Sequence, residues 1–375
     1  MKRLGLRSQK EGVDKKLLFT TFLLVFVGIV AVADASAPQA LNVFGDKFKF
    51  LKDQLLWAFI GSIVLFITSR INYKFWQKIA TPLFFFVVIS LILVLIPGIG
   101  AKLLGARRWI SVGSIFFQPS EFAKFGLILF LSKLMSMKKA SILYFLPLVI
   151  VSGLVMLQPD LGTTMIIALT AVVQIFSSEI NLLHFTGVGI LGSLVVFLLV
   201  MVSPYRKERL LTFLEQTSDP LGRSYHIRQI LLALGSGGLF GVGLGASKQK
   251  YLFLPESSTD SIFAVIAEEV GFIGAMALIF LLGFYVVRGI KIAKHAPDKF
   301  SQYLALGISS WIGIQMVLNI ASMTALVPLT GIPLPFISYG GSSLVMLMFA
   351  TGILLNISRY ISLSERPNIS RRRIK

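Results

Sequence analysis

Cysteine is absent from this chain of 375 residues, and histidine, acidic residues and charge in general are scarce. Without cysteine the protein cannot form a disulfide framework, a thiolate nucleophile or a cysteine-ligated metal site. Its three histidines are scattered, without metal-ligand spacing or a Ser-His-Asp arrangement. They are His184, His226 and His295. These shortages exclude thiol chemistry and argue against histidine-based metal or triad chemistry.

The chain is instead rich in apolar residues. Hydrophobic residues make up 55% of it, charged residues only 14%, and the mean hydropathy is +0.81. A soluble domain of this size needs far more charge to cover its surface, so a soluble protein with an unusually large core is the weaker interpretation. The net charge of +19 suits nucleic acid or anionic lipid. In a membrane protein we expect contact with membrane lipids and no nucleic acid partner.

The apolar residues fall into about ten runs of roughly 16–26 residues, a length that crosses a membrane as a helix. We place these runs near 17–35, 53–69, 79–96, 120–137, 142–158, 162–178, 183–203, 261–287, 302–324 and 336–357. No segment between them is long enough for an independent soluble domain. The sequence therefore predicts an all-α polytopic membrane protein with one integral membrane domain over residues 1–375.

The first apolar run also resembles part of a signal peptide. Lys15 and Lys16 precede it, and the sequence ADASA (33–37) after it resembles a signal-peptidase site. Comparable apolar runs follow, however, and this one is long enough to span a membrane. We interpret it as an uncleaved first transmembrane helix.

Lys and Arg are distributed unevenly over the connections between the spans, and this bias sets the orientation. Most of them lie in the two tails, 1–16 and 358–375, and in the connections near 70–78, 133–139 and 288–299. All five segments fall on one side of the predicted membrane. We therefore expect both termini to be cytoplasmic.

Two segments on the opposite side are also basic. The segment 97–120 carries Arg107 and Arg108, and a long extracytoplasmic loop between spans seven and eight, 204–260, carries several more cations. Long loops cross the membrane regardless of charge, so these cations either are simply solvated or bind an anionic ligand. Within the loop, 206–216 and 223–234 have helical apolar spacing and are suited to lie on the outer leaflet.

Charged residues also stand at the outer ends of predicted spans. Glu121 and Lys124 open the fourth span three residues apart, on one helix face. They either form a neutralising pair that lets the helix insert or line a site. Asp160 lies between spans five and six, where it either caps a helix or faces a ligand.

The stretch 235–271 carries the strongest functional signal. Asp260 falls in the first turn of an apolar helix, where an acidic residue favours the helix dipole. The dipole does not explain Glu268 and Glu269, which lie about 12 Å deeper, where carboxylates are costly. Adjacent helical residues point about 100° apart, so Glu268 is the better candidate to share a pocket with Asp260.

Glycine-rich sequences lie before this helix and at the start of the last predicted span. The glycines of 235–245 are not a phosphate-binding loop, because GxxxxGK[ST] is missing and no predicted strand precedes them. They are better suited to a re-entrant or interfacial segment that packs closely or bends. The run GIPLPFISYGGSS (331–343) indicates a broken helix start beside a cavity.

Together these residues place an exposed carboxylate, further carboxylates and cations on the outer face. Such a set suits general-base catalysis on a hydroxyl beside a leaving diphosphate, optionally with a divalent metal. From charge and topology we expect Arg107 and Arg108 to assist diphosphate binding. Glu121, Lys124, Glu268 and Asp160 are the other candidate substrate-binding residues.

Several long motifs resemble those of the SEDS proteins (shape, elongation, division and sporulation), the FtsW/RodA/SpoVE group of peptidoglycan glycosyltransferases. The motifs are GARRWI (105–110), QPSEFAK (118–124), QPDLGT (158–163), LPESSTDSIFAVIAEEVG (254–271) and PLTGIPLPFISYGGSS (328–343). The resemblance runs from the first span to the last. The SGGLFGVGLGASKQKYLFLPE run is more similar to FtsW than to RodA, which favours septal cell-wall synthesis over elongation.

The resemblance implies polymerisation of lipid II on the outer face of the bacterial cytoplasmic membrane. Asp260 matches the aspartate of the family's Thr-Asp motif, and would deprotonate the acceptor GlcNAc 4-hydroxyl or hold Mg²⁺ or Mn²⁺ while undecaprenyl diphosphate leaves. Glu121 and Lys124 match the pair that lines the family's central cavity. Implied partners are a class B penicillin-binding transpeptidase and membrane proteins of the divisome or elongasome. No organic cofactor is implied.

The chain departs from the family pattern at two places. Family members usually read His-Thr-Asp-Phe where this chain has Ser258-Thr259-Asp260-Ser261, so no role of that imidazole carries over. In NIASMTALVP (319–328), alanine and serine replace frequent glycines, which affects local packing.

Two other functions fit part of the pattern. A flippase for the same lipid accounts for many spans and intramembrane charges, but its key charges should lie at the midplane or on both leaflets. A non-catalytic assembly scaffold predicts that substitutions at Asp260 and Glu121 leave growth unaffected. The polymerase is the favoured hypothesis.

Overall fold

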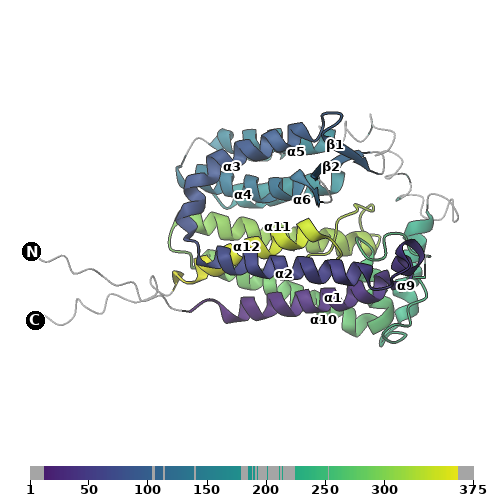
Figure 1. The fold of residues 1–375 in the computed structure, drawn as a ribbon. Helices are drawn as coiled ribbons and strands as arrows, with labels where there is room; N and C mark the ends of the chain where they lie inside the picture. The colour runs from purple at the N-terminus through teal and green to yellow at the C-terminus, as the bar shows by residue number, and fades with distance from the viewer. Residues whose placement is uncertain are drawn as a thin grey trace, which may run out of the picture.

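The computed structural model describes residues 12–103, 106–112, 115–138, 141–178, 224–251 and 253–361, with isolated residues between 185 and 213. Its helices lie side by side in a bundle (Figure 1). They are α1 (Lys15–Phe44), α2 (Lys49–Arg70), α3 (Tyr73–Leu93), α4 (Pro119–Ser136), α5 (Phe145–Leu157), α6 (Leu161–Phe176), α9 (Tyr225–Gly237), α10 (Ile262–Lys294), α11 (Lys299–Met323) and α12 (Gly341–Ser358). A short 3-10 helix, η1 (Ser141–Tyr144), precedes α5.

The predicted polytopic helical fold is confirmed. Every predicted span except the seventh coincides with a helix, and the seventh, 183–203, lies largely outside the described residues, as does the predicted stretch 206–216. In the described part of the chain, 6 helices are long and apolar enough to cross a membrane. The stretch predicted as helical over 223–234 is α9.

The first helix is longer than predicted. Asp14 accepts a hydrogen bond from the backbone of Leu17 and caps its start, and Gly45, with φ of 69°, ends it in the left-handed region. Between them α1 continues through 33–37 and Pro38 without a break. The resemblance to a signal-peptidase site therefore falls inside continuous helix.

A small antiparallel sheet follows α3 and was not predicted. Its strands are β1 (Gly100–Leu103), β2 (Ala106–Val112) and β3 (Ile115–Phe117), in the order β1-β2-β3. Gly100 pairs with Ile110, and Ile110 also pairs with Phe117. The sheet lies at the same end of the bundle as α9 (Figure 1).

The start of α1 and the end of α12 meet at the opposite end. The backbone N–H of Asp14 donates to Ser358 Oγ at 3.1 Å. Arg288, near the end of α10, forms an ion pair with Asp14. Tyr73 Oη donates to Asp298 Oδ2 at 2.6 Å at the starts of α3 and α11. This end corresponds to the side that the sequence predicts to be cytoplasmic.

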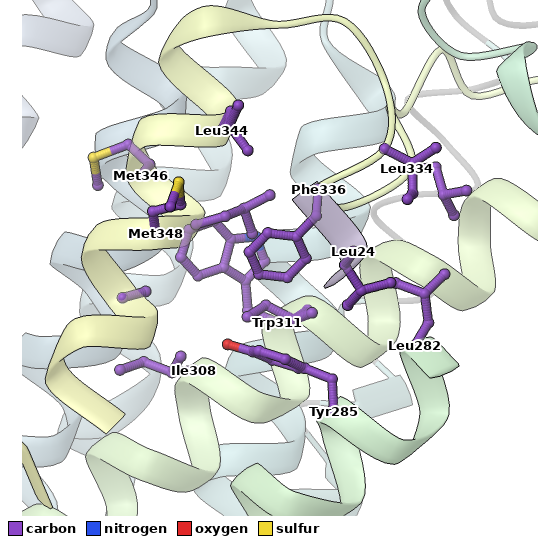
Figure 2. Packing of buried hydrophobic residues seen from close by; sticks show 14 of the residues in the cluster. Leu24, Leu282, Tyr285, Ile308, Trp311, Leu334, Phe336, Leu344, Met346 and Met348 are labelled. Carbon is purple, nitrogen blue, oxygen red and sulfur yellow. The ribbon is translucent and has the colours of Figure 1, made fainter. Parts of the chain in front are cut away.

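The hydrophobic core has two parts. One joins α1 and α2 to α10, α11 and α12, and the other lies among α3, α4, α5 and α6. In the first part Phe336, which belongs to the loop before α12, points into the cluster that holds Trp311 and Tyr285 (Figure 2). The rings of Phe336 and Tyr285 lie 5.1 Å apart. The loop between α11 and α12 is thus anchored in the core.

Candidate active site

The α11–α12 loop (residues 324–340) is the element around which the predicted site residues gather. Phe336 adopts a left-handed φ of 64°, a strained conformation for a bulky residue, and its 2% exposed side chain holds it there. Ser338 Oγ accepts from the Leu334 backbone at 2.8 Å and braces the turn. The N–H of Tyr339 donates to the Ser258 carbonyl at 2.9 Å. This last bond ties the loop to the turn that carries Asp260.

Asp260 immediately precedes Ser261, the N-cap residue of α10, and is partly exposed. Its backbone carbonyl accepts from Asn319 Nδ2 of α11 at 2.8 Å. Its Oδ2 lies 3.7 Å from the point where a side chain on Gly331 would begin, so the carboxylate faces the α11–α12 loop. Glycine at 331, with φ of 67°, both permits the left-handed turn and leaves room for the carboxylate.

The neighbours of Asp260 include a second carboxylate. Thr259 Oγ1 lies 2.8 Å from Glu256 Oε2 and 3.4 Å from Asp260 Oδ1. One hydroxyl thus stands between two acidic side chains. On the other side, His226 Nε2 of α9 lies 2.9 Å from Ser261 Oγ.

Glu121 and Lys124 form a buried ion pair in the first turns of α4. Lys124 Nζ lies 2.7 Å from Glu121 Oε1, and the side chains are 2% and 5% exposed. The ammonium also donates to Gln315 Oε1 at 3.3 Å and stands 5.0 Å from the Trp311 ring centroid. Gln315 Nε2 donates to the carbonyl of Pro333 at 3.0 Å. The pair is therefore linked to the α11–α12 loop.

Asp160 is the N-cap of α6, one of the two roles left open by its position. Its carboxylate accepts from Thr163 N at 3.0 Å and Thr163 Oγ1 at 2.8 Å. Gly162, in the first turn of the helix, lies directly against the carbonyl of Thr330. The start of α6 thus adjoins the same loop that Asp260 faces.

Arg108 connects the small sheet to this corner. Its Nε donates to the carbonyl of Gln158 at 3.1 Å, and it also donates to the carbonyl of Pro159. The side chain therefore holds β2 against the turn that ends in Asp160. Arg107 precedes it on the strand and pairs with Lys102, whereas the pairing of β2 with β1 skips Arg108. The two arginines thus stand at an irregularity in the strand pairing, which directs Arg108 toward this turn.

Around the α11–α12 loop, then, the structure assembles Asp260, the Glu121–Lys124 pair and the start of α6. Glu121 stands in the first turn of α4, Asp160 caps α6, and Asp260 precedes α10. All three helix starts lie at the bundle end that carries the small sheet (Figure 1). Positive ends of helix dipoles and a buried ammonium favour an anion at this place.

Glu268 and Glu269 lie deeper and hold a different segment. Glu268 accepts from Ser247 Oγ and from the backbone of Lys248 at 3.1 Å, while Glu269 accepts from the backbone of Ser247 at 3.2 Å. Both side chains are buried. Their visible role is to fix the turn 247–250. That Glu268 binds substrate stays a prediction.

The glycine-rich segment 237–243 inserts into a break in α10. Gly271 has a non-helical φ of 70° and ψ of −173°, which interrupts the helix. Four backbone hydrogen bonds join the segment to the break: Val242 N to Glu268 O, Gly243 N to Glu269 O, Phe272 N to Gly238 O, and Ile273 N to Leu239 O. The segment thus satisfies backbone groups that the break frees. The close packing predicted for these glycines is confirmed, and a re-entrant or interfacial position of the segment stays a prediction.

Lys250, in the turn 247–250 that follows the glycine-rich segment, anchors this turn to α1. Its Nζ lies 2.6 Å from Asp34 Oδ1 and 2.8 Å from Glu269 Oε1. Burial lowers the pKa of Lys250, but the hydrogen bonds to the two carboxylates outweigh it, and the pKa lies above its ordinary value. The three side chains form a charged clamp between α1, α10 and this turn.

Several polar residues of the site were not predicted from the sequence. Gln315 and Asn319 are both fully buried on α11, and Glu256 and Thr259 precede Asp260. The sequence does contain a pattern that indicates Gln315 and Asn319, because two amides four residues apart in an apolar span need hydrogen-bond partners inside the protein. Their partners are loop carbonyls, which no side-chain pattern reveals.

Comparison with known proteins gives a consistent picture. A family model described as cell cycle protein, covering FtsW, RodA and SpoVE, matches residues 15–363. Stage V sporulation protein E of Bacillus subtilis (strain 168) is 44% identical over 364 residues, which cover 94% of this chain and 99% of that protein. A probable peptidoglycan glycosyltransferase FtsW of Trichlorobacter lovleyi is 42% identical over 359 residues, 94% of either chain.

Solved structures share the fold. A chain from a peptidoglycan synthase complex, described as coordinating polymerization and crosslinking, superposes with a TM-score of 0.77 at 28% identity over 93% of this chain and 98% of that chain. The Thermus thermophilus rod shape determining protein RodA superposes with a TM-score of 0.69 at 28% identity over 93% and 97%. The predicted SEDS-type architecture is thereby confirmed.

Proposed function

Because this chain belongs to the FtsW/RodA/SpoVE family, we propose that it is a peptidoglycan glycosyltransferase that polymerises lipid II. The observation that carries the mechanism is the partly exposed Asp260 carboxylate beside a loop that also contacts the buried Lys124–Glu121 pair through Gln315. A base and a cation thus lie around one loop. This combination suits a reaction that removes a proton from one group while a diphosphate leaves from another.

In the proposed reaction Asp260 takes the proton of the acceptor GlcNAc 4-hydroxyl. The hydroxyl oxygen forms the new bond to the anomeric carbon of the donor sugar, and the bond from that carbon to the diphosphate oxygen breaks. Lys124, with Arg107 on the central strand of the small sheet, stabilises the leaving undecaprenyl diphosphate. Because Lys124 is buried and paired with Glu121, its charge would act on the diphosphate through the protein interior, where the effective dielectric constant is low, and not by direct contact.

A divalent cation, Mg²⁺ or Mn²⁺, fits the residues beside Asp260. No group of three or more His, Asp or Glu side chains in the described residues forms a complete metal cage. Mg²⁺, however, usually takes one or two carboxylates and completes its shell with substrate phosphates and water. Asp260 and Glu256, on either side of the Thr259 hydroxyl, would hold it, and the cation would stabilise charge on the diphosphate. Glu256→Gln should then raise the metal concentration needed for half-maximal activity.

We place the reaction on the outer face of the bacterial cytoplasmic membrane, with both termini in the cytoplasm. The Lys and Arg bias supports this orientation. A class B penicillin-binding transpeptidase is the proposed partner, supported by the likeness to a chain of a peptidoglycan synthase complex. Septal synthesis within the divisome is favoured by relatives named FtsW, with RodA-like elongation as the alternative.

The site supports a polymerase rather than a lipid II flippase. Glu121, Asp160 and Asp260 all stand at helix starts on one end of the bundle, whereas a flippase needs charged groups along the translocation path. One-sided charges are what a reaction on one leaflet requires.

The decisive test is polymerisation of lipid II by the purified protein with Mg²⁺ or Mn²⁺ and its transpeptidase. The wild type should make glycan strands, and Asp260→Ala should lose activity by at least about a hundredfold, as expected for loss of a general base. Asp46→Asn, an exposed acid at the same end, is the matched control and should keep full activity. Wild-type activity in Asp260→Ala would refute the assignment.

A further inference from the structure

Two amides on α11, Gln315 and Asn319, occupy a place between the proposed catalytic carboxylate and the buried ion pair. Both are fully buried, and residues four apart lie on the same face of a helix, about one turn from each other. Burial without partners is costly for an amide, so their contacts determine what they do.

Both N–H groups of the Asn319 side-chain amide donate hydrogen bonds. Nδ2 donates to the carbonyl of Asp260 at 2.8 Å and to that of Ile332 at 2.7 Å. One side chain therefore sets the distance between the backbone at Asp260 and the α11–α12 loop that the carboxylate faces. The Asp260 carbonyl needs this partner, because the first N–H of the following turn, on Ala264, bonds to Ser261 instead.

One turn earlier, Gln315 makes the corresponding contacts toward α4. Its Oε1 accepts from Lys124 Nζ at 3.3 Å and from Trp311 Nε1 at 2.9 Å, and its Nε2 donates to the carbonyl of Pro333 at 3.0 Å. Adjacent loop carbonyls, at 332 and 333, are thus bound by the two amides in turn. Because α11 is a continuous helix, the two attachment points cannot shift independently.

We propose that Asn319 is a positioning residue for Asp260, and that Gln315 and Asn319 together fix the separation between the Asp260 carboxylate and the Lys124 ammonium. In this role both amides act through protein groups, the carbonyls of Asp260, Ile332 and Pro333 and the Lys124 ammonium. They act by holding a base and a cation in register, and misplacement of a reacting group by about 1 Å can cost a hundredfold in rate. This inference rests on the proposed function, because it needs Asp260 to be the base.

The test compares Asn319→Ala and the isosteric Asn319→Asp, which cannot donate, with wild type in lipid II polymerisation. We expect kcat to fall at least about tenfold in both, with KM changed less than about twofold, since the groups proposed to bind the diphosphate are untouched. Gln315→Ala should behave similarly but also raise KM, because it releases Lys124.

Asn356→Ala is the matched control for a purely structural loss. Asn356 is a buried asparagine on α12 that also bridges helices, accepting from Tyr73 N at 2.9 Å and donating to Ser69 O at 2.9 Å, but at the opposite end of the bundle. Its loss should lower thermal stability and leave kcat at the wild-type value. If Asn319→Ala retains the kcat of Asn356→Ala, the positioning role is wrong.

A double variant of Asn319 and Asp260 provides a second, independent test of the positioning role. Asp260→Glu moves the carboxylate outward, so adding Asn319→Ala to that variant should cost much less than in the wild type. Equal losses in both backgrounds would overturn the inference. If the wild type does not polymerise lipid II, the proposed function fails, and if Asp260→Ala polymerises it normally, the assignment of Asp260 as the base fails. If Asp260→Ala is inactive and Asn319→Ala is not, only the positioning role fails.

Discussion

The buried contact between Lys124 and Glu121 determines whether either charge is tolerated in the protein interior. Each charge is almost completely removed from solvent, so each is tolerable only because the other is present. Glu121 Oε2 has no hydrogen-bond partner among the described residues, which leaves that oxygen dependent on the ammonium beside it. The pair is therefore a structural requirement of the site as well as a proposed source of positive charge.

Removing one partner should be worse than removing both. Lys124→Met leaves the Glu121 carboxylate buried without a counter-ion, and we expect a loss of about 3–5 kcal/mol in the free energy of unfolding. The double variant Glu121→Gln/Lys124→Met has no buried charge and should recover most of that stability. Thermal unfolding of the purified variants in one detergent measures both effects.

Measurements of polymerisation activity distinguish the structural role of the pair from its proposed role as a source of positive charge. The double variant should fold and yet fail to polymerise lipid II, because the cation proposed to stabilise the leaving diphosphate is gone. A double variant that is no more stable than Lys124→Met, or one that is fully active, would contradict this account of the pair.

Among the residues, those predictable from the sequence were the ones that break the apolar pattern. Glu121, Lys124, Asp160 and Asp260 stand out as charges at span ends, and the structure brings them around one loop. Arg108, predicted to assist diphosphate binding, bonds the carbonyls of Gln158 and Pro159, and its role toward the diphosphate stays a prediction. The irregular strand pairing and the turn at 158–159 determine where that side chain lies, and neither is visible in the sequence.

At the scale of elements, the break in α10 has the clearest physical cause. The glycine-rich segment approaches the helix so closely that a side chain at Gly241 would collide with the carbonyl of Glu269. Gly241 also has φ of 83°, a conformation that other residues rarely adopt. Only glycine meets both conditions, so the position is a sensitive probe of this packing.

We expect Gly241→Ala to lower the free energy of unfolding by more than about 2 kcal/mol, the sum of left-handed strain and the collision. Gly235→Ala is the control on the preceding helix, α9, where no atom lies within 4 Å of the added carbon. That variant should gain about 0.5–1 kcal/mol from helix propensity. Thermal unfolding ranks the two variants, and equal melting temperatures would count against the inserted segment.

The clamp that Lys250 forms with Asp34 and Glu269 predicts that its contribution to the free energy of unfolding depends on pH. Because its pKa is raised in the folded state, the stabilisation is complete below the ordinary lysine value of 10.5 and is lost as pH rises through the folded value. Wild type should exceed Lys250→Met by on the order of 3 kcal/mol at neutral pH. The gap should stay constant from about pH 7 to 9 and close only above the ordinary lysine pKa.

Unfolding curves at stepped pH measure this gap. Lys248→Met, a neighbouring lysine outside the clamp, should follow the wild type throughout. A gap that closes near neutrality would mean that Lys250 is not the group that titrates.

Helix positions followed from the sequence because each span is a long apolar run, whereas connections did not. The three-stranded sheet over 100–117 is built from short strands, and no periodic pattern in the sequence predicts how they pair. The break at Gly271 is likewise invisible, because the apolar pattern of 262–294 continues across it. In both places long-range backbone hydrogen bonds, rather than local preference, determine the structure.

On the scale of the whole molecule, the two ends of the bundle differ in kind. One end joins Asp14, Ser358 and Arg288 in a network that ties the first helix to the last. The other carries the small sheet and α9 (Figure 1). The starts of α4, α6 and α10, where the proposed site residues stand, lie at the same end. The proposed function requires the second end to face outward, because the proposed reaction uses lipid II on the outer face of the membrane. The orientation of the bundle can be measured directly.

The absence of cysteine makes that measurement clean, since any introduced thiol is the only one in the chain. Lys47→Cys places an exposed thiol between α1 and α2 at the catalytic end, and Lys299→Cys places one at the start of α11 at the opposite end. In intact cells a membrane-impermeant maleimide should label the first and not the second, and permeabilisation should make both react. Neither site belongs to the proposed machinery, so both variants should retain activity. Labelling of Lys299→Cys alone in intact cells would reverse the topology, and a reversed bundle would leave Asp260 on the side of the membrane where polymerisation does not take place.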